Sequence, residues 1–266
     1  MKRLAPSASM PQITDPRSAV WSAMGWDGKL SLMSADLHFD RIRRHAARLG
    51  IDVPVDLRDR VFDILAQTEH PGEPNRSIDQ AAFLVSIGVR SDGDVFVEPI
   101  ILQEWMEATL DAISLAAPIW DSDVRGTKHG DWGPHREARE IAVKHGAHIA
   151  LLFEDEILVD GDRCAPLLLD HDGVAYHPRH DDGALDSITI EQIRPHLESA
   201  GIPVRPARLT LSMILRASEM VVCGSGMGIR AVGTIDGRRI GTPGGMLFRT
   251  CYEAWSERLV NGWTSR

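Results

Sequence analysis

Apolar residues recur at helical spacing in several parts of the chain. In residues 37–50, Ile42, Ala46 and Leu49 fall on one face of a helix, and Gly50 ends it. The same spacing predicts further helices around residues 57–64, 135–145, 190–197 and 248–255, and over 108–117 before a proline. Each of these helices would turn one apolar face toward a core.

Apolar runs rich in β-branched residues predict strands among these helices. Residues 81–89 and 95–101 are two such runs, and the turn sequence Ser91-Asp-Gly-Asp between them predicts a β-hairpin. Shorter strands are predicted over 149–153, 157–159, 166–169, 220–223, 229–235 and 238–240. Short strands in hairpins with interspersed helices favour an α+β fold in two subdomains.

Composition narrows the class of protein. The 266 residues are 43% hydrophobic and 25% charged, which is typical of a globular chain with one large domain or two modest ones. The net charge of −9 argues against a general binder of nucleic acid or of anionic membranes, but it leaves room for a local basic pocket. We find neither a membrane-length apolar run nor a signal-peptide core. Three widely spaced cysteines indicate reduced thiols of a cytoplasmic protein, and neither a disulfide framework nor a zinc site.

One lysine lies in an unusual segment, Arg125-Gly-Thr-Lys-His-Gly-Asp-Trp-Gly-Pro, just before a predicted helix. A lysine on a surface turn is the plain interpretation of Lys128. The functional interpretation is a lysine that faces a cleft, where desolvation or a nearby cation lowers its pKa and lets the neutral amine form a Schiff base.

Three other segments have features of anion sites. Thr189 and Gln192 fit a capping box at a helix start, where free N–H groups and the helix dipole attract anions. Cys223-Gly-Ser-Gly-Met-Gly resembles a glycine-rich phosphate turn, and Arg41 lies among several arginines of its helix. An ordinary cap, a tight turn and a solvated face explain each segment equally well. His177 and His180 lie in turn-like sequence without a metal motif, so we do not favour a metal site there.

The order of these segments resembles the class IV aminotransferases, the fold-type IV pyridoxal 5′-phosphate (PLP) enzymes. That family includes branched-chain and D-amino-acid aminotransferases and aminodeoxychorismate lyase, and the resemblance spans about residues 19–255. His38-Phe-Asp-Arg-Ile is similar to the family's His-Leu-x-Arg-Leu helix, and Thr127-Lys-His-Gly-Asp-Trp is similar to its lysine segment. Leu185-Asp-Ser-Ile-Thr is similar to its Leu-Gly-Ile-Thr turn, and Gly224-Ser-Gly-Met-Gly to its Gly-Thr-Ala stretch.

The resemblance implies a role for each matching position. Lys128 would carry the Schiff base with PLP, and Asp160 would pair with the pyridine nitrogen. The phosphate would be bound by Arg41, the backbone amides of Ile188 and Thr189, and the turn residues Ser225 and Gly226. The fold implied is the two-domain architecture of these enzymes, α+β in class, with PLP between the domains.

The sequence departs from the family pattern at several positions. Asp160 stands where the family has glutamate, and Ala165 where it has asparagine. Trp21 and Ser22 stand where the family has Phe-Glu, and the opening of the chain is short, so we expect a shortened N-terminal domain with an altered or missing active-site wall. The predicted division is an arm over 1–17, a small domain over 18–117, a linker over 118–127 and a PLP-binding domain over 128–266.

The function implied is a PLP-dependent aminotransferase acting on small-molecule amino acids and 2-oxo acids. Two alternatives stay open: a PLP lyase of the aminodeoxychorismate type, and a degenerate homologue without PLP chemistry. The resemblance also implies a homodimer, because family members build each active site at a dimer interface. No nucleic-acid or membrane partner is expected.

Overall fold

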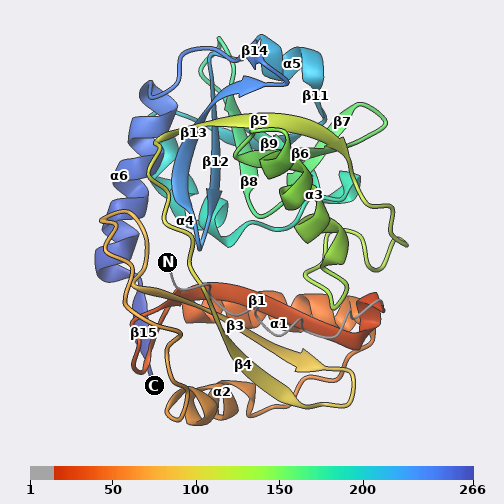
Figure 1. Cartoon of the computed structure of the whole chain (residues 1–266), viewed down its shortest axis with the longest axis vertical. Coiled ribbons are helices and arrows are strands. Elements are labelled where there is room, and N and C mark those ends of the chain that lie inside the picture. Colours follow the sequence, from red (N-terminus) through yellow and green to blue (C-terminus); the bar gives the residue numbers. More distant parts are fainter. Residues whose placement is uncertain (1–14) are drawn as a thin grey trace, which may run out of the picture.

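The computed structural model describes residues 15–266, which form a smaller and a larger β-sheet (Figure 1). The smaller sheet has the order β15-β2-β1-β3-β4, and the larger one has the order β10-β9-β8-β12-β13-β5-β6-β7-β11, with β14 paired to β13. The predicted arm over 1–17 falls almost wholly outside the described residues. The mixture of sheets and helices confirms the predicted α+β class.

The smaller unit combines its sheet with two helices. Its elements are β1 (Ala19–Trp26), β2 (Ser31–Met33), α1 (Ala35–Leu49), α2 (Leu57–Leu65), β3 (Phe83–Arg90), β4 (Val95–Ile100) and β15 (Trp263–Ser265). The β3–β4 hairpin, α1 and α2 were all predicted from the hydrophobic pattern. Side chains of α1 and α2, such as Phe39 and Phe62, pack with β1 and β3 in one core.

The larger unit contains the remaining strands and four helices. These elements are β5 (Thr109–Ala116), α3 (Gly133–Lys144), β6 (Ile149–Glu154), β7 (Ile157–Gly161), β8 (Ala165–Leu169), β9 (Ala175–Pro178), α4 (Ile188–Ser199), β10 (Val204–Ala207), β11 (Leu209–Thr210), α5 (Leu211–Leu215), β12 (Glu219–Gly224), β13 (Gly228–Ile235), β14 (Arg238–Arg239) and α6 (Met246–Asn261). Helix α3 packs on β5 and β6, whereas α4 and α6 pack on each other and on β12. The segments of the candidate active site lie between these helices and α1.

The predicted helix over 108–117 is wrong, because this stretch is strand β5. Leu110 and Ala112 are buried while Thr109 and Asp111 are exposed, so the local alternation has the period of a strand. The strand is central in the larger sheet and pairs in parallel with both β6 and β13. Non-local pairing therefore overrides the helical spacing of its apolar residues.

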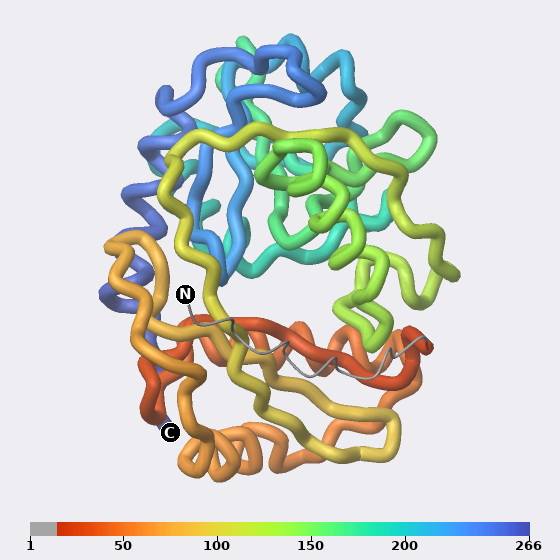
Figure 2. The backbone as a smooth tube through the Cα atoms, viewed as in Figure 1, coloured from red at the N-terminus to blue at the C-terminus, as the bar shows by residue number. Residues whose placement is uncertain are grey.

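Each sheet contains one strand that the predicted division at residues 118–127 assigns to the other domain. Figure 2 shows the chain crossing upward in the yellow segment and returning to the smaller sheet at its blue end. Thus β5 precedes residues 118–127 but lies in the larger sheet, and β15 follows them but lies in the smaller one. The division of the chain into domains at residues 118–127 stays a prediction.

Two further observations concern the cysteines and the composition of the helices. All three cysteines are free and buried. Within residues 15–266, none of the helices has both the length and the apolar composition that crossing a bilayer requires.

Candidate active site

Helix α1 presents a row of polar side chains to the seam between the two units. His38, Arg41 and His45 recur at a spacing of three and four residues, so they share one face, and all three are buried. Arg41 donates from Nη2 to Ser22 Oγ at 2.6 Å and from Nη1 to the Asp186 carbonyl at 3.1 Å. Its Nε is buried and has no partner among residues 15–266. Desolvation lowers the pKa of Arg41 to about 10, and the guanidinium stays protonated at neutral pH.

Lys128 lies between two indole rings. Its Nζ is 4.3 Å from the ring centroid of Trp21 and 4.1 Å from that of Trp132. The two indoles meet edge to face, and Trp21 donates its main-chain N–H to the Lys128 carbonyl at 3.1 Å. Trp21 belongs to β1, which is an eight-residue strand, and the expectation of an altered or missing active-site wall stays a prediction.

The surroundings of Lys128 favour its neutral amine. Desolvation lowers its pKa from the ordinary value of 10.5 to about 7, and the charge of Arg41 acts in the same direction. The carboxylates of Asp160 and Asp186 oppose that shift. Near pH 7 the side chain is therefore divided between amine and ammonium.

Asp160 lies on β7, where its carboxylate accepts two main-chain hydrogen bonds. The N–H of Gly161 donates to Oδ1 at 2.9 Å and that of Leu185 to Oδ2 at 3.3 Å. Desolvation nevertheless raises the pKa of Asp160 to about 7, while those two N–H groups, Lys128 and Arg41 hold it down. The side chain thus takes up or gives off a proton in the same pH range as Lys128.

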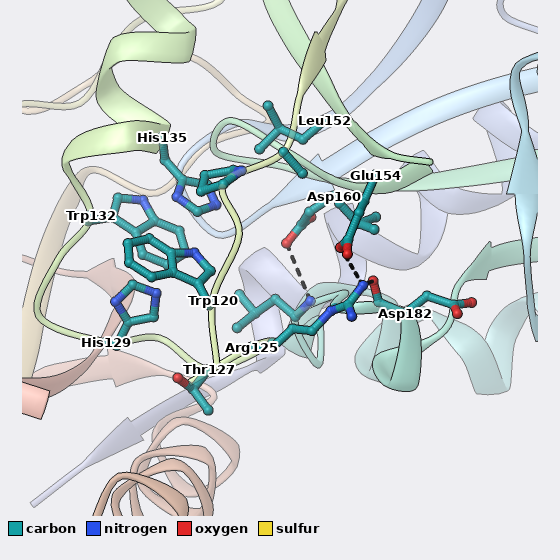
Figure 3. Close-up of a pocket in the computed structure, with 16 residues that line it drawn as sticks. Trp120, Arg125, Thr127, His129, Trp132, His135, Leu152, Glu154, Asp160 and Asp182 are labelled. Atoms are coloured by element: carbon teal, nitrogen blue, oxygen red, sulfur yellow. Dashed lines mark hydrogen bonds and ion pairs between the residues drawn. The ribbon is translucent and has the colours of Figure 1, made fainter. Parts of the chain in front are cut away.

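Two cavities adjoin Asp160. The smaller, of about 30 Å³, has aromatic residues gathered on one side and acidic residues on the other (Figure 3). The larger, of about 450 Å³, extends between α1, α4 and β9. Neither cavity has Lys128 or Arg41 among its lining residues.

Helix α4 begins next to this carboxylate. The predicted cap of Thr189 with Gln192 is wrong, because the helix starts two residues earlier and Ser187 is its N-cap, accepting the Ile190 N–H at 3.3 Å. The local signal was ambiguous, since both Ser187 and Thr189 are residues that favour caps. The N–H groups of Ile188 and Thr189, in the first turn of α4, have no intrahelical acceptor, which is the feature that favours anions at helix starts.

The turn between β12 and β13 carries Ser225 and Gly226. Strand β12, which leads into this turn, packs against α4. The Gly226 carbonyl accepts a hydrogen bond of 2.7 Å from Gln80 Nε2. A Cβ at Gly226 would lie 3.0 Å from Leu84 of β3, so the absence of a side chain lets this turn approach the smaller unit closely.

The structure brings most of the predicted residues into one neighbourhood. Arg41 and Asp160 both act on the pKa of Lys128, and the Arg41 guanidinium donates to the Asp186 carbonyl in the turn that leads into α4. Arg163, which follows Asp160 closely in the sequence, bonds Gln103 and lies over the ring of Trp105. Within the described chain there is no cluster of three or more metal-ligating side chains.

Sequence reasoning missed two residues of this neighbourhood. His45 Nδ1 accepts the main-chain N–H of Lys128 at 2.9 Å, and His45 Nε2 lies 3.0 Å from Asp186 Oδ1. The position of His45, one helical turn after Arg41, was a usable signal. Asp186 gave none, because a single aspartate in a loop is too common.

A model of the family described as "Amino-transferase class IV" matches residues 22–235. The chain belongs to the class IV aminotransferase family. No curated protein matches this member.

Solved structures of similar fold cover nearly the whole chain of this class IV protein. The branched-chain aminotransferase of Thermoproteus uzoniensis, solved with norvaline, is 18% identical over 94% of this chain and 90% of that one, with a TM-score of 0.75. The branched-chain aminotransferase of T.th., complexed with N-(5′-phosphopyridoxyl)-L-glutamate, is 16% identical over 96% and 91%, also at 0.75. A putative 4-amino-4-deoxychorismate lyase from Legionella pneumophila is 18% identical over 96% and 97%, at 0.74.

The protein is thus an enzyme of the class IV PLP group, and PLP is its cofactor. The residues present fit this group chemically. Lys128 offers an amine that is partly neutral near pH 7, and Asp160 offers a carboxylate for a protonated ring nitrogen. The unpartnered Nε of Arg41 and the free amides that begin α4 offer donors to a phosphate.

Proposed function

We propose that this class IV protein is a PLP-dependent aminotransferase that moves an amino group between an amino acid and a 2-oxo acid. The observation that carries the proposal is the position of Lys128, whose Nζ lies between the indoles of Trp21 and Trp132, where desolvation lowers its pKa to about 7. A neutral amine is the form that bonds covalently to a carbonyl carbon.

Lys128 has two tasks in this proposal. It would hold the cofactor through a covalent bond of Nζ. When Nζ is free, its neutral amine would take a proton from the substrate carbon that bears the amino group and would later give that proton up again. A group with a pKa near the working pH is best suited to take and return protons. When bound, PLP supplies the electron sink for this chemistry. Trp21 and Trp132 shield Nζ from water.

The remaining predicted residues bind the two ends of the cofactor. Arg41, the amides of Ile188 and Thr189, and Ser225 with Gly226 bind the phosphate. Asp160 pairs with the ring nitrogen, whose positive charge would favour the ionised form of the carboxylate. Asp160 is one methylene shorter than glutamate. Its carboxylate accepts a hydrogen bond from the Leu185 N–H, which holds the carboxylate near the turn that precedes α4.

We also propose a homodimer in the cytoplasm. Large exposed apolar side chains flank the chain's passage between the two sheets: Ile101 is 79% exposed and Met106 is 83% exposed. Burial in a second copy would remove this surface from water. Reduced thiols, such as the three buried cysteines, persist in the cytoplasm. Light scattering of the purified protein tests the dimer, and a monomer at micromolar concentration would refute it.

The decisive experiment for the function is borohydride reduction of the protein in the presence of PLP, followed by peptide mass spectrometry. The chain contains only four lysines, so the labelled position can be assigned without ambiguity. We expect the label on Lys128, its loss in Lys128→Ala, and its retention in Lys144→Ala, which changes an exposed lysine at the end of α3. A wild-type protein that carries no label on Lys128 refutes the proposal and supports the degenerate homologue.

Substrate assays then separate the two reactions. Incubation with L- or D-amino acids and 2-oxoglutarate should yield the corresponding 2-oxo acid and glutamate. Release of pyruvate from aminodeoxychorismate, without amino transfer, would favour the lyase instead.

A further inference from the structure

One polar chain joins the segment of Lys128 to the turn that begins α4. The Lys128 main-chain N–H donates to His45 Nδ1 at 2.9 Å, and His45 Nε2 lies 3.0 Å from Asp186 Oδ1. Asp186 directly precedes Ser187, the N-cap of α4, and its own carbonyl accepts from Arg41. One histidine of α1 thus contacts both segments that the proposed cofactor site requires.

The protonation states of this chain are fixed by its geometry. An imidazole nitrogen that accepts an N–H carries no proton, so the proton of neutral His45 sits on Nε2, toward Asp186. The carboxylate of Asp186 is ionised: although desolvation raises its pKa, contacts with His45, Arg41 and Arg44 lower it to about 2. The pair therefore places a neutral imidazole nitrogen 3.0 Å from a charged carboxylate oxygen, and this oxygen has no hydrogen bond of regular geometry among residues 15–266.

Because these groups are buried, losing their contacts would cost free energy. His45 is 3% exposed, and its hydrogen bond from the Lys128 N–H is partly buried. Removing the imidazole would leave the Lys128 N–H without its acceptor. The Arg44 contact to Asp186 Oδ2, at 2.6 Å, would remain, so the turn before α4 would not be released altogether.

We propose that His45, together with Asp186, is a positioning residue. It fixes the position of the Lys128 main chain relative to the start of α4, where the phosphate is proposed to bind. The inference rests on the proposed role of Lys128. His45 touches neither cofactor nor substrate and acts through the two segments that it joins. Without it, the amine and the phosphate site would each persist but would shift relative to one another, so the cofactor would bind less tightly.

The test compares His45→Ala, His45→Gln, Asp186→Asn and a control, His145→Ala, whose side chain is exposed at the C-terminal end of α3. The first readout is amide hydrogen exchange of Lys128 in the full-length protein. The second is the dissociation constant of PLP, measured by titration of the protein from which PLP has been removed. The unfolding free energy of every variant is measured in parallel.

We expect His45→Ala to speed exchange of the Lys128 amide at least about tenfold and to weaken PLP binding about tenfold, because a buried donor loses its acceptor. Glutamine can accept with Oε1 and donate with Nε2, so His45→Gln should restore most of both properties. Asp186→Asn should fall between the two, and its effect should not add fully to that of His45→Ala. The control should match wild type.

Two outcomes overturn the inference. One is a Lys128 amide and a PLP dissociation constant within twofold of wild type in His45→Ala. The other is faster exchange at every amide in proportion to lost stability, which is what a merely structural histidine would cause. If His45→Ala does not fold, Asp186→Asn takes its place, and a Lys128 amide exchange rate and a PLP dissociation constant both within twofold of wild type then overturn the inference. If wild type binds no PLP, the proposed function fails, but the exchange readout still tests His45.

Discussion

Replacing Lys128 by methionine should stabilise the cofactor-free protein, because the fold holds this amine away from water. The shift of its pKa from 10.5 to about 7 corresponds to a penalty of about 5 kcal/mol, at about 1.4 kcal/mol per pKa unit. Lys128 keeps partial contact with solvent, which we take to halve this figure. Losing the contacts with Trp21 and Trp132 costs about 1 kcal/mol. A net gain of about 1–2 kcal/mol remains.

The gain should depend on pH in a defined way. Between pH 7 and 10.5 the unfolded chain binds the Lys128 proton more tightly than the folded one, so wild-type stability rises with pH in this range. Lys128→Met should therefore be more stable than wild type by its full margin below pH 7, and the margin should shrink toward pH 10.5.

Denaturant unfolding of the stripped proteins at pH 6, 8 and 10 measures this margin. Lys144→Met, which changes an exposed lysine of α3, serves as the control and should stay within about 0.5 kcal/mol of wild type. The reasoning is refuted if Lys128→Met is no more stable at pH 6, or if its margin is the same at pH 6 and pH 10.

Substitutions at three further positions test the other parts of the candidate site. Asp160→Asn should leave PLP attached to Lys128 but slow single-turnover amino transfer at least about 100-fold, because a neutral amide does not balance a cationic ring nitrogen. Asp160→Glu should stay within about tenfold of wild type. Equal rates for Asp160→Asn and wild type would contradict the proposed role of Asp160. Arg41→Ala should weaken PLP binding about 10- to 100-fold by calorimetry, since a charge-assisted contact to phosphate is lost, and unchanged affinity would remove Arg41 from the phosphate site. Trp21→Ala should admit water and raise the pKa of Lys128. The pH midpoint for modification of Lys128 by an amine reagent should therefore move upward. A downward move would mean that the indole acts chiefly through its attraction for the ammonium.

Most of the local structure could be predicted from the sequence, because hydrophobic spacing reports which face of an element is buried. Helix α1 with Gly50 at its end and the β3–β4 hairpin follow from local patterns alone. Strand β5 did not, because its place depends on pairing with β6 and β13, which lie far along the chain. The α4 cap failed for a smaller reason, since two cap-favouring residues stand two positions apart.

The sequence by itself determined which chemical groups the candidate site contains and their order, because Lys128, Arg41 and Asp160 stand in segments whose motifs resemble those of the family. Only the tertiary structure decided their electrostatic states. The pKa of Lys128 falls toward 7 because two indoles and the charge of Arg41 surround it, and these groups come from β1, α1 and the start of α3. The link through His45 and Asp186 likewise exists only where α1 crosses two loops. Desolvation and buried hydrogen bonds depend on distances between residues far apart in the chain, which no local pattern records.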